Sequence, residues 1–211
     1  GLTDMLVISV KSKGVFRKQT SYQLYRGIEV NGKLEFTREP VTTIESKGYQ
    51  FEIEGLDFNN DNQTDMLISA VDIGLGKVLG ALVTGAVSID LNFYQMRKGL
   101  YSGKPDLKRE IKATFDLRSG DFFFPSVLIA DADSDGIDDL LVQEGEDQLN
   151  IFLGSGDASL FSKSPTVIDV HMPSDPELVV AADLNRDGKV DLMMRHEPST
   201  GPKKIVLLVS E

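Results

Sequence analysis

The chain has 211 residues, a hydrophobic fraction of 41% and a formal net charge of −11 at pH 7. This length and apolar content are enough to bury the core of one large domain or two ordinary ones. An acidic chain without a basic stripe is not expected to bind nucleic acid, because phosphates require Lys and Arg. The chain has no cysteine, which excludes disulfides, thiolate nucleophiles and cysteine-bound zinc.

The first quarter of the chain is predicted to form β-strands joined by turns. Residues 5–10 are a continuous apolar run, which is typical of a buried strand, and residues 11–18 are predicted to be a solvated basic turn. Asn31-Gly32 is the strongest short signal for a β-hairpin. Further strands are predicted at residues 21–30, 33–37 and 50–54.

Residues 73–87 are nearly all apolar but contain four glycines. A phosphate-binding loop does not fit, because Val78 rather than Ser or Thr follows Gly76-Lys77. A transmembrane helix needs about 18 apolar residues, and this run is shorter. We expect a short buried helix or hairpin packed on the rest of the domain, with contact to a membrane or a partner as the alternative.

Two alternating runs follow, at residues 88–96 and 110–117. Alternation of apolar and polar residues is typical of half-buried strands. We predict that the two runs form an extended hairpin, so that the segment from about residue 70 to 120 is an insertion.

The stretch 131–142 carries the clearest chemistry of the chain. Four carboxylates lie at positions 1, 3, 5 and 9 of a loop, and Gly136 at position 6 allows the tight turn that points them to one centre. The backbone carbonyl of Ile137, at position 7, is expected to face the same centre. Hard oxygen ligands in this number suit Ca²⁺, whereas Mg²⁺ prefers stricter octahedral geometry and is the weaker candidate.

Two other interpretations of this loop were considered. An EF-hand needs a Glu at position 12 and a helix on each side, but position 12 is Val142 and residues 140–142 are typical of a buried strand. A single acidic turn could also be solvated and bind nothing.

Further copies of the loop argue against a solvated turn. The pattern returns at residues 183–191 and at 57–65, where Asn62 replaces the glycine, and Gly1 to Asp4 match positions 6 to 9 of a fourth loop. A recurrence about every 50–75 residues indicates a repeat architecture. We predict about three Ca²⁺ ions. The candidate ligands are Asp57, Asn59, Asp61, Gln63 and Asp65, then Asp131, Asp133, Asp135, Ile137 and Asp139, and then Asp183, Asn185, Asp187, Lys189 and Asp191.

The strands after the second loop complete the repeat unit. Residues 149–153 are followed by a Gly154-Ser155-Gly156 turn and by Phe161, and further strands are predicted at 166–170, 177–182 and 204–209. Each unit thus reads as a strand, an acidic loop, a strand, a turn and one or two more strands, which fits a four-stranded blade.

The run D-x-[DN]-x-D-G-x-x-D-L, preceded by an apolar strand, resembles the FG-GAP/VCBS repeats of integrin α-subunit-type β-propellers. The resemblance covers residues 126–194 best and residues 51–69 well. It implies an all-β fold of about three to four four-stranded blades with calcium-binding loops. We expect residues 1–211 to form one propeller-like repeat domain, partial or open, that belongs to a longer propeller.

The resemblance also implies a function. We expect a non-catalytic extracellular module that binds a protein, cell-surface or glycan ligand, with structural Ca²⁺ in its loops. An accessory propeller of a secreted enzyme acting on polysaccharide or lipid is the alternative. His171 and His196 are far apart in sequence and are expected to be surface residues. Loops with Asn ligands and no Glu at position 12 fit weak sites of about 10⁻⁴–10⁻³ M, which favours an extracellular, cell-surface or periplasmic location.

Overall fold

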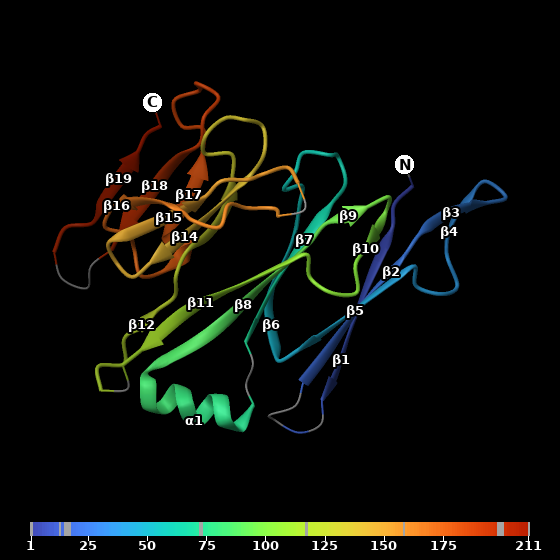
Figure 1. The fold of residues 1–211 in the computed structure, drawn as a ribbon, viewed down its shortest axis with the longest axis horizontal. Helices are drawn as coiled ribbons and strands as arrows, with labels where there is room; N and C mark the ends of the chain where they lie inside the picture. The colour runs from blue at the N-terminus through green and yellow to red at the C-terminus, as the bar shows by residue number, and fades with distance from the viewer. Residues whose placement is uncertain are drawn as a thin grey trace. The chain divides into compact units, whose positions relative to one another are not determined.

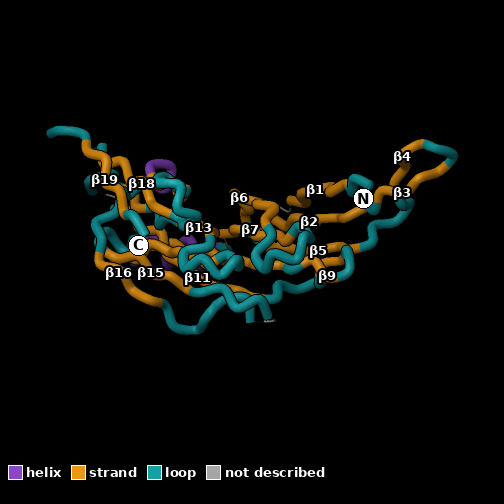
Figure 2. Tube along the Cα trace, turned by 90° about the horizontal axis from the view of Figure 1, so that it is seen from above, coloured by secondary structure: helices purple, strands orange, loops and turns teal. Residues whose placement is uncertain are grey.

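The computed structural model describes residues 2–12, 14, 18–71, 74–116, 118–157, 159–197 and 201–210, without the side chains of residues 51–53. The chain divides into two compact units. Unit 1 comprises Gly1–Leu56 and Gln63–Ile111, and unit 2 comprises Asp57–Asn62 and Lys112–Glu211. Both units consist mainly of antiparallel strands joined by loops (Figures 1 and 2), so the prediction of an all-β fold is confirmed.

The first sheet of unit 1 has the strand order β1-β2-β5, and a separate hairpin joins β2 to β5. Asn31 and Gly32 form the hairpin turn with φ angles of 52° and 72°, as predicted. The predicted strand 21–30 is divided at Arg26, because the backbone N–H of Gly27 turns to the carboxylate of Asp4 at 2.8 Å. The strands are β1 (Met5–Ser12), β2 (Lys18–Tyr25), β3 (Gly27–Val30), β4 (Lys33–Phe36) and β5 (Thr42–Lys47).

The prediction that residues 5–10 are buried is wrong. Leu6, Ile8 and Val10 of β1 are 39%, 48% and 59% exposed. β1 is the edge strand of its sheet, and an apolar run alone does not tell a covered strand from an uncovered one. Of the predicted turn 11–18, the strands take up residues 11, 12 and 18, and residues 13 and 15–17 lie outside the described residues.

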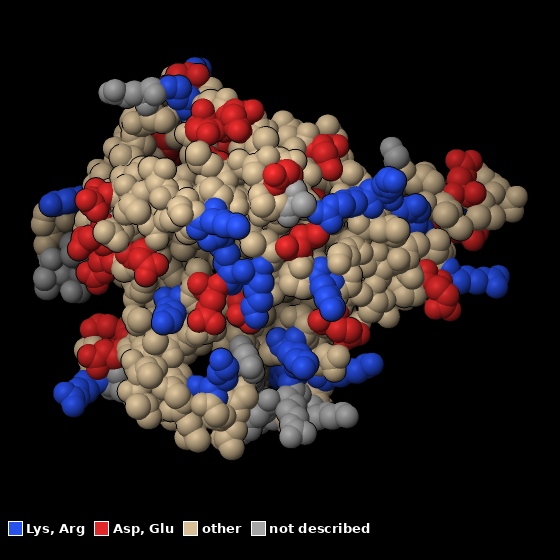
Figure 3. All heavy atoms as spheres, viewed as in Figure 1, with Lys and Arg blue, Asp and Glu red and all other residues tan. Residues whose placement is uncertain are grey.

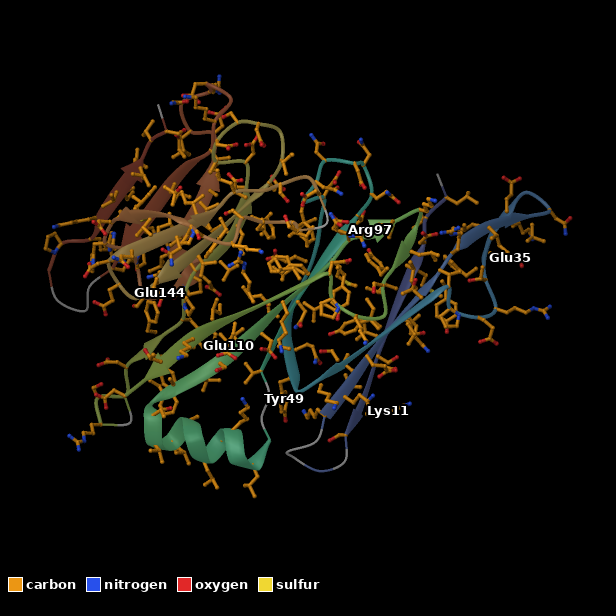
Figure 4. All side chains as sticks on the ribbon, viewed as in Figure 1. Lys11, Glu35, Tyr49, Arg97, Glu110 and Glu144 are labelled. Carbon is orange, nitrogen blue, oxygen red and sulfur yellow. The ribbon has the colours of Figure 1, made fainter. Side chains whose placement is uncertain are left out.

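The second sheet of unit 1 contains the strands on either side of the first acidic loop. Its order is β11-β8-β7-β6, so the hairpin predicted at 88–117 continues the same sheet through β8. The hydroxyl of Ser88 in β8 donates to the carboxylate of Glu110 in β11 at 3.1 Å (Glu110 is labelled in Figure 4). The strands are β6 (Tyr49–Leu56), β7 (Asp65–Val71), β8 (Ala86–Tyr94) and β11 (Leu107–Phe115), with the short hairpin β9 (Met96–Arg97) and β10 (Leu100–Tyr101).

The two sheets of unit 1 share a core. Its buried side chains come from β2 and β5 of the first sheet and from β7 and β8 of the second. Burial of such side chains supplies most of the stability of a two-sheet unit. They are Tyr22, Ile44, Met66, Ile68 and Tyr94.

The helix α1 (Leu75–Thr84) lies between β7 and β8, as one of the interpretations of residues 73–87 predicted. The expectation that it is buried is wrong, because none of its residues is buried. Leu75, Leu79 and Val83 are 59%, 56% and 86% exposed. Among the described residues, no helix is long and apolar enough to cross a membrane.

Unit 2 contains one four-stranded and one three-stranded sheet (Figure 1). The strands of the four-stranded sheet follow one another in chain order as an antiparallel meander. The end of β11 continues into unit 2 and pairs with a short strand. The elements are β12 (Phe122–Phe123), β13 (Val127–Ala130), β14 (Asp139–Glu144), β15 (Gln148–Phe152), β16 (Thr166–Asp169), the 3₁₀ turn η1 (Pro176–Leu178), β17 (Val179–Ala182), β18 (Asp191–His196) and β19 (Lys204–Leu208).

The two sheets of unit 2 also share a core. It is built from β14 and β15 of one sheet, from β17 and β18 of the other, and from the segment between them. The pattern of unit 1 is therefore repeated. The buried side chains are Leu141, Leu149, Met172, Val179, Leu192 and Met194.

Candidate metal centres

Three acidic loops each join the first two strands of a sheet. We name them loop A (residues 57–65, between β6 and β7), loop B (131–139, between β13 and β14) and loop C (183–191, between β17 and β18). Loops B and C lie within unit 2. Loop A crosses the division of the chain, with Asp57–Asn62 in unit 2 and Gln63 onward in unit 1, so its two parts are described separately.

The first aspartate organises each loop through two backbone hydrogen bonds. In loop B, Asp131 accepts from the N–H of Asp135 at 3.2 Å and from the N–H of Gly136 at 2.9 Å. These bonds curl the loop so that its oxygens face inward. The same pair is formed by Asp57 with the N–H groups of Asp61 (3.0 Å) and Asn62 (2.9 Å), and by Asp183 with those of Asp187 (3.2 Å) and Gly188 (3.0 Å).

All three loops have positive φ angles at positions 4 and 6. In loop B these residues are Ser134 (65°) and Gly136 (88°). Asn62 takes position 6 of loop A with φ of 62°, because Asn tolerates this region better than most residues. Asn62 therefore takes the backbone conformation that glycine has in loops B and C. The other such residues are Asn60, Arg186 and Gly188.

The residues at positions 3 and 5 continue this network. Asp133 accepts from the N–H of Asp135 at 3.2 Å, and Asp135 accepts from the N–H of Ile137 at 2.8 Å. Loops A and C carry Asn at position 3, and its side-chain oxygen takes the same bond. The distances are 3.2 Å from Asn59 to Asp61, 2.9 Å from Asn185 to Asp187, and 2.9 Å from Asp187 to the N–H of Lys189.

The closing aspartates of loops A, B and C are buried and accept backbone hydrogen bonds, a role that the sequence pattern did not reveal. Asp139 is 1% exposed, and it accepts from the N–H groups of Gly154 (2.7 Å) and Ala132 (2.9 Å). It thereby ties the start of loop B to the end of β15. Matching bonds run to Asp191 from Ser210 (3.0 Å) and Leu184 (2.9 Å), to Asp65 from Met96 (2.7 Å), and to Asp4 from Gly27 (2.8 Å).

Loop B brings three carboxylates to one point. One oxygen each of Asp131, Asp133 and Asp139 lies within 4.8 Å of the others. Such a set of hard oxygen donors fits Ca²⁺, which accepts about 6–8 oxygens in loose geometry. Asp135 lies outside this group of three, and the side chain of Gln63 in loop A accepts from the N–H of Gly99 at 2.9 Å. The carbonyl ligands at Gln63, Ile137 and Lys189 stay predictions.

Electrostatics distinguish loop B from loop C. Burial raises the pKa of Asp139, the hydrogen bonds from Gly154 and Ala132 oppose the rise, and the charges of Asp133 and Asp131 add to it. Burial also acts on Asp191, but its hydrogen bonds outweigh burial and leave its pKa lowered. Loop C has Asn185 where loop B has Asp133. The carboxylates of loop B therefore repel each other more than those of loop C, and a bound cation would relieve more repulsion in loop B.

His171 and His196, which are distant in sequence, stack on one another in unit 2. Their ring centroids are 5.3 Å apart with planes 11° from parallel, and Nδ1 of His171 lies 2.8 Å from a carboxylate oxygen of Asp147. The pair borders a pocket of about 610 Å³. Burial lowers the pKa of His196, and His171 and Lys204 add to this effect. Spacing in the sequence gives no signal of this pairing, because it depends on how two sheets pack.

One comparison with known proteins agrees with the resemblance of the acidic loops. Residues 114–194 match the family model of the FG-GAP-like repeat. The matched region contains the whole sheet β13–β16 with loop B, and it continues through loop C into β18. A comparison with curated proteins gives no match. Residues 114–194 are thus similar to an FG-GAP-like repeat.

Proposed function

We propose that the chain is a β-propeller-type module in which loops A, B and C each bind one Ca²⁺. The observation that carries this proposal is the cluster of Asp131, Asp133 and Asp139 oxygens in loop B. The hydrogen bonds of the first aspartate in loops A and C match those in loop B. Four carboxylates in one loop repel each other unless a cation offsets their charge.

The ion is structural in this proposal. Each loop connects the first two strands of a sheet, so an ion that orders the loop also fixes the start of that sheet. Because the ligands converge only in the folded chain, calcium binding adds to the free energy of folding. The four-stranded meander β13–β16 and the cores shared by successive sheets fit the blades of a propeller.

We further propose that the module works outside the cell and binds a protein, cell-surface or glycan ligand without catalysis. Support comes from the loops, whose Asn ligands and lack of a Glu at position 12 fit affinities of about 10⁻⁴–10⁻³ M. Such sites fill only at extracellular calcium concentrations. Retention of cell-surface glycoprotein or glycan on the immobilised chain in CaCl₂, with release in EDTA, would support this role, and no retention in CaCl₂ would contradict it.

Calorimetric titration with CaCl₂ tests the metal proposal directly. We expect about three ions per chain. Asp135→Ala should remove or strongly weaken one site, whereas Glu35→Gln should leave all three unchanged, because Glu35 is an exposed carboxylate on β4 (labelled in Figure 4). The absence of any binding heat, with the chain folded, would overturn the proposal.

A further inference from the structure

The first part of loop A docks onto loop B within unit 2. The N–H of Asp138 donates to the carbonyl of Phe58 at 3.2 Å, and the side-chain amide of Asn60 donates to the carbonyl of Gly136 at 3.0 Å. The rings of Phe58 and Phe161 lie 6.2 Å apart at 58°, and each residue is only 2% exposed. The two acidic loops therefore share two hydrogen bonds, and Phe58 of loop A also packs on Phe161, which follows β15.

Each of these hydrogen bonds is made by a peptide group that adjoins candidate ligands. Phe58 lies between Asp57 and Asn59 of loop A. The N–H of Gly136 binds Asp131, the first ligand of loop B, while its carbonyl accepts from Asn60. A change in the shape of one loop must therefore move atoms that help to shape the other.

The backbone of Asp138 is confined on two sides, by a hydrogen bond from its N–H and by close packing at its carbonyl. Its N–H bonds to Phe58, and its carbonyl lies so close to Gly154 that a Cβ on Gly154 would stand 2.4 Å from that oxygen. Asp138 precedes the closing ligand Asp139 and follows Ile137. The peptide between these two candidate ligands has little room to move unless loop A moves as well.

We propose that loops A and B bind calcium with positive cooperativity through this docking contact. The inference rests on the proposed function. Binding of one ion orders its loop and, through the contact, part of the other, so the second ion has less ordering left to do. Repulsion between the two ions opposes this effect. It does not dominate, because loop A offers three candidate ligand carboxylates and loop B four, so each site stays net negative after binding one Ca²⁺.

The loops provide their own reporters for a test. The amides of Asn62, Gly136 and Gly188 each bond to the first aspartate of their loop. Titration of the ¹⁵N-labelled chain with CaCl₂, followed by NMR at these three amides, gives a separate midpoint for loops A, B and C. If none of the three amides responds in the folded chain, the proposed calcium function itself fails.

Asn60→Gly removes the side-chain bond to loop B while keeping a residue that accepts the φ of 53°. We expect it to raise the calcium midpoint at Gly136 about fivefold, at the lower end of typical coupling between sites. Arg186→Gly is the matched control, because Arg186 takes the same position in loop C with φ of 67°. This control should leave the midpoint at Gly136 unchanged.

Reciprocity supplies the second test. Asp61→Ala in loop A should weaken loop B by the same factor as Asp135→Ala weakens loop A, because coupling between two binding equilibria is mutual. The cooperativity would be refuted if calcium binds but neither Asn60→Gly nor a ligand variant in one loop changes the midpoint of the other loop, read at Asn62 or Gly136. That result would leave the proposed calcium sites in place.

Discussion

At the scale of single residues, the closing aspartates differ from the exposed ligands of the same loops. Asp139 is buried and accepts two backbone hydrogen bonds, whereas Asp135 is exposed and bonds within its own loop. Asp139 therefore stabilises the fold with or without a bound ion, whereas Asp135 is expected to contribute mainly by binding the ion.

This difference predicts that only the Asp139 variant loses stability in the absence of calcium. Asp139→Ala leaves the part-buried N–H groups of Gly154 and Ala132 without their acceptor, so we expect a loss of about 2 kcal/mol in EDTA. The loss should be larger in CaCl₂, because a candidate ligand is removed as well. Asp135→Ala should lower the Tm in CaCl₂ and hardly change it in EDTA. Thermal unfolding of both variants measures this, and an equal loss for Asp135→Ala in the two buffers would refute its role as a ligand.

Asp138 predicts a pH effect in the absence of calcium. Its pKa is raised, first by burial and then by the charges of Asp131, Asp139 and Asp57. A carboxyl group with a folded pKa above its unfolded value costs stability as the pH rises through the folded pKa. In EDTA at pH 7, Asp138→Asn should therefore raise the Tm, and the gain should vanish toward pH 4, near the unfolded pKa of Asp. A gain that is the same at both pH values would contradict this.

At the scale of elements, two glycines illustrate opposite constraints. A Cβ at Gly80 of α1 would meet no atom within 4 Å, whereas one at Gly154 would stand 2.4 Å from the carbonyl of Asp138. Gly80→Ala should stabilise the chain by about 0.5–1 kcal/mol, because glycine inside a helix loses more entropy on folding. Gly154→Ala should destabilise it and raise the calcium midpoint of loop B. Urea unfolding measures both, and a destabilising Gly80→Ala would show that α1 is covered.

The sequence predicted well what local chemistry decides. The Asn31-Gly32 turn, the curl of loops A, B and C, and the strands around loop B depend on residues close in the chain. Prediction from the sequence failed for features that depend on contacts between residues far apart in the chain. Such features depend on how sheets and loops pack, which the spacing of residues in the sequence does not indicate. They are the exposure of β1 and α1, the docking of Asn60 on Gly136 and the stacking of His171 on His196.

At the scale of the whole molecule, charge links the loops to stability. On the face shown in Figure 3, Asp and Glu lie among Lys and Arg. The chain carries a net charge of −11, and three Ca²⁺ ions would reduce it to −5. The three loops supply ten candidate ligand carboxylates, so much of the negative charge of the chain lies at the proposed calcium sites. We therefore expect the loops, rather than the general surface, to set how stability responds to divalent cations.

The most direct test is thermal unfolding of the chain in CaCl₂ and in EDTA, with equal MgCl₂ as the control. At ten times its Kd, calcium contributes about 1.4 kcal/mol for each site, so three sites should raise the Tm by about 10 °C for a chain of this size, with a smaller rise in MgCl₂. The same Tm in CaCl₂ and EDTA would contradict the account, because loops A, B and C would then be acidic turns that hold no structural ion.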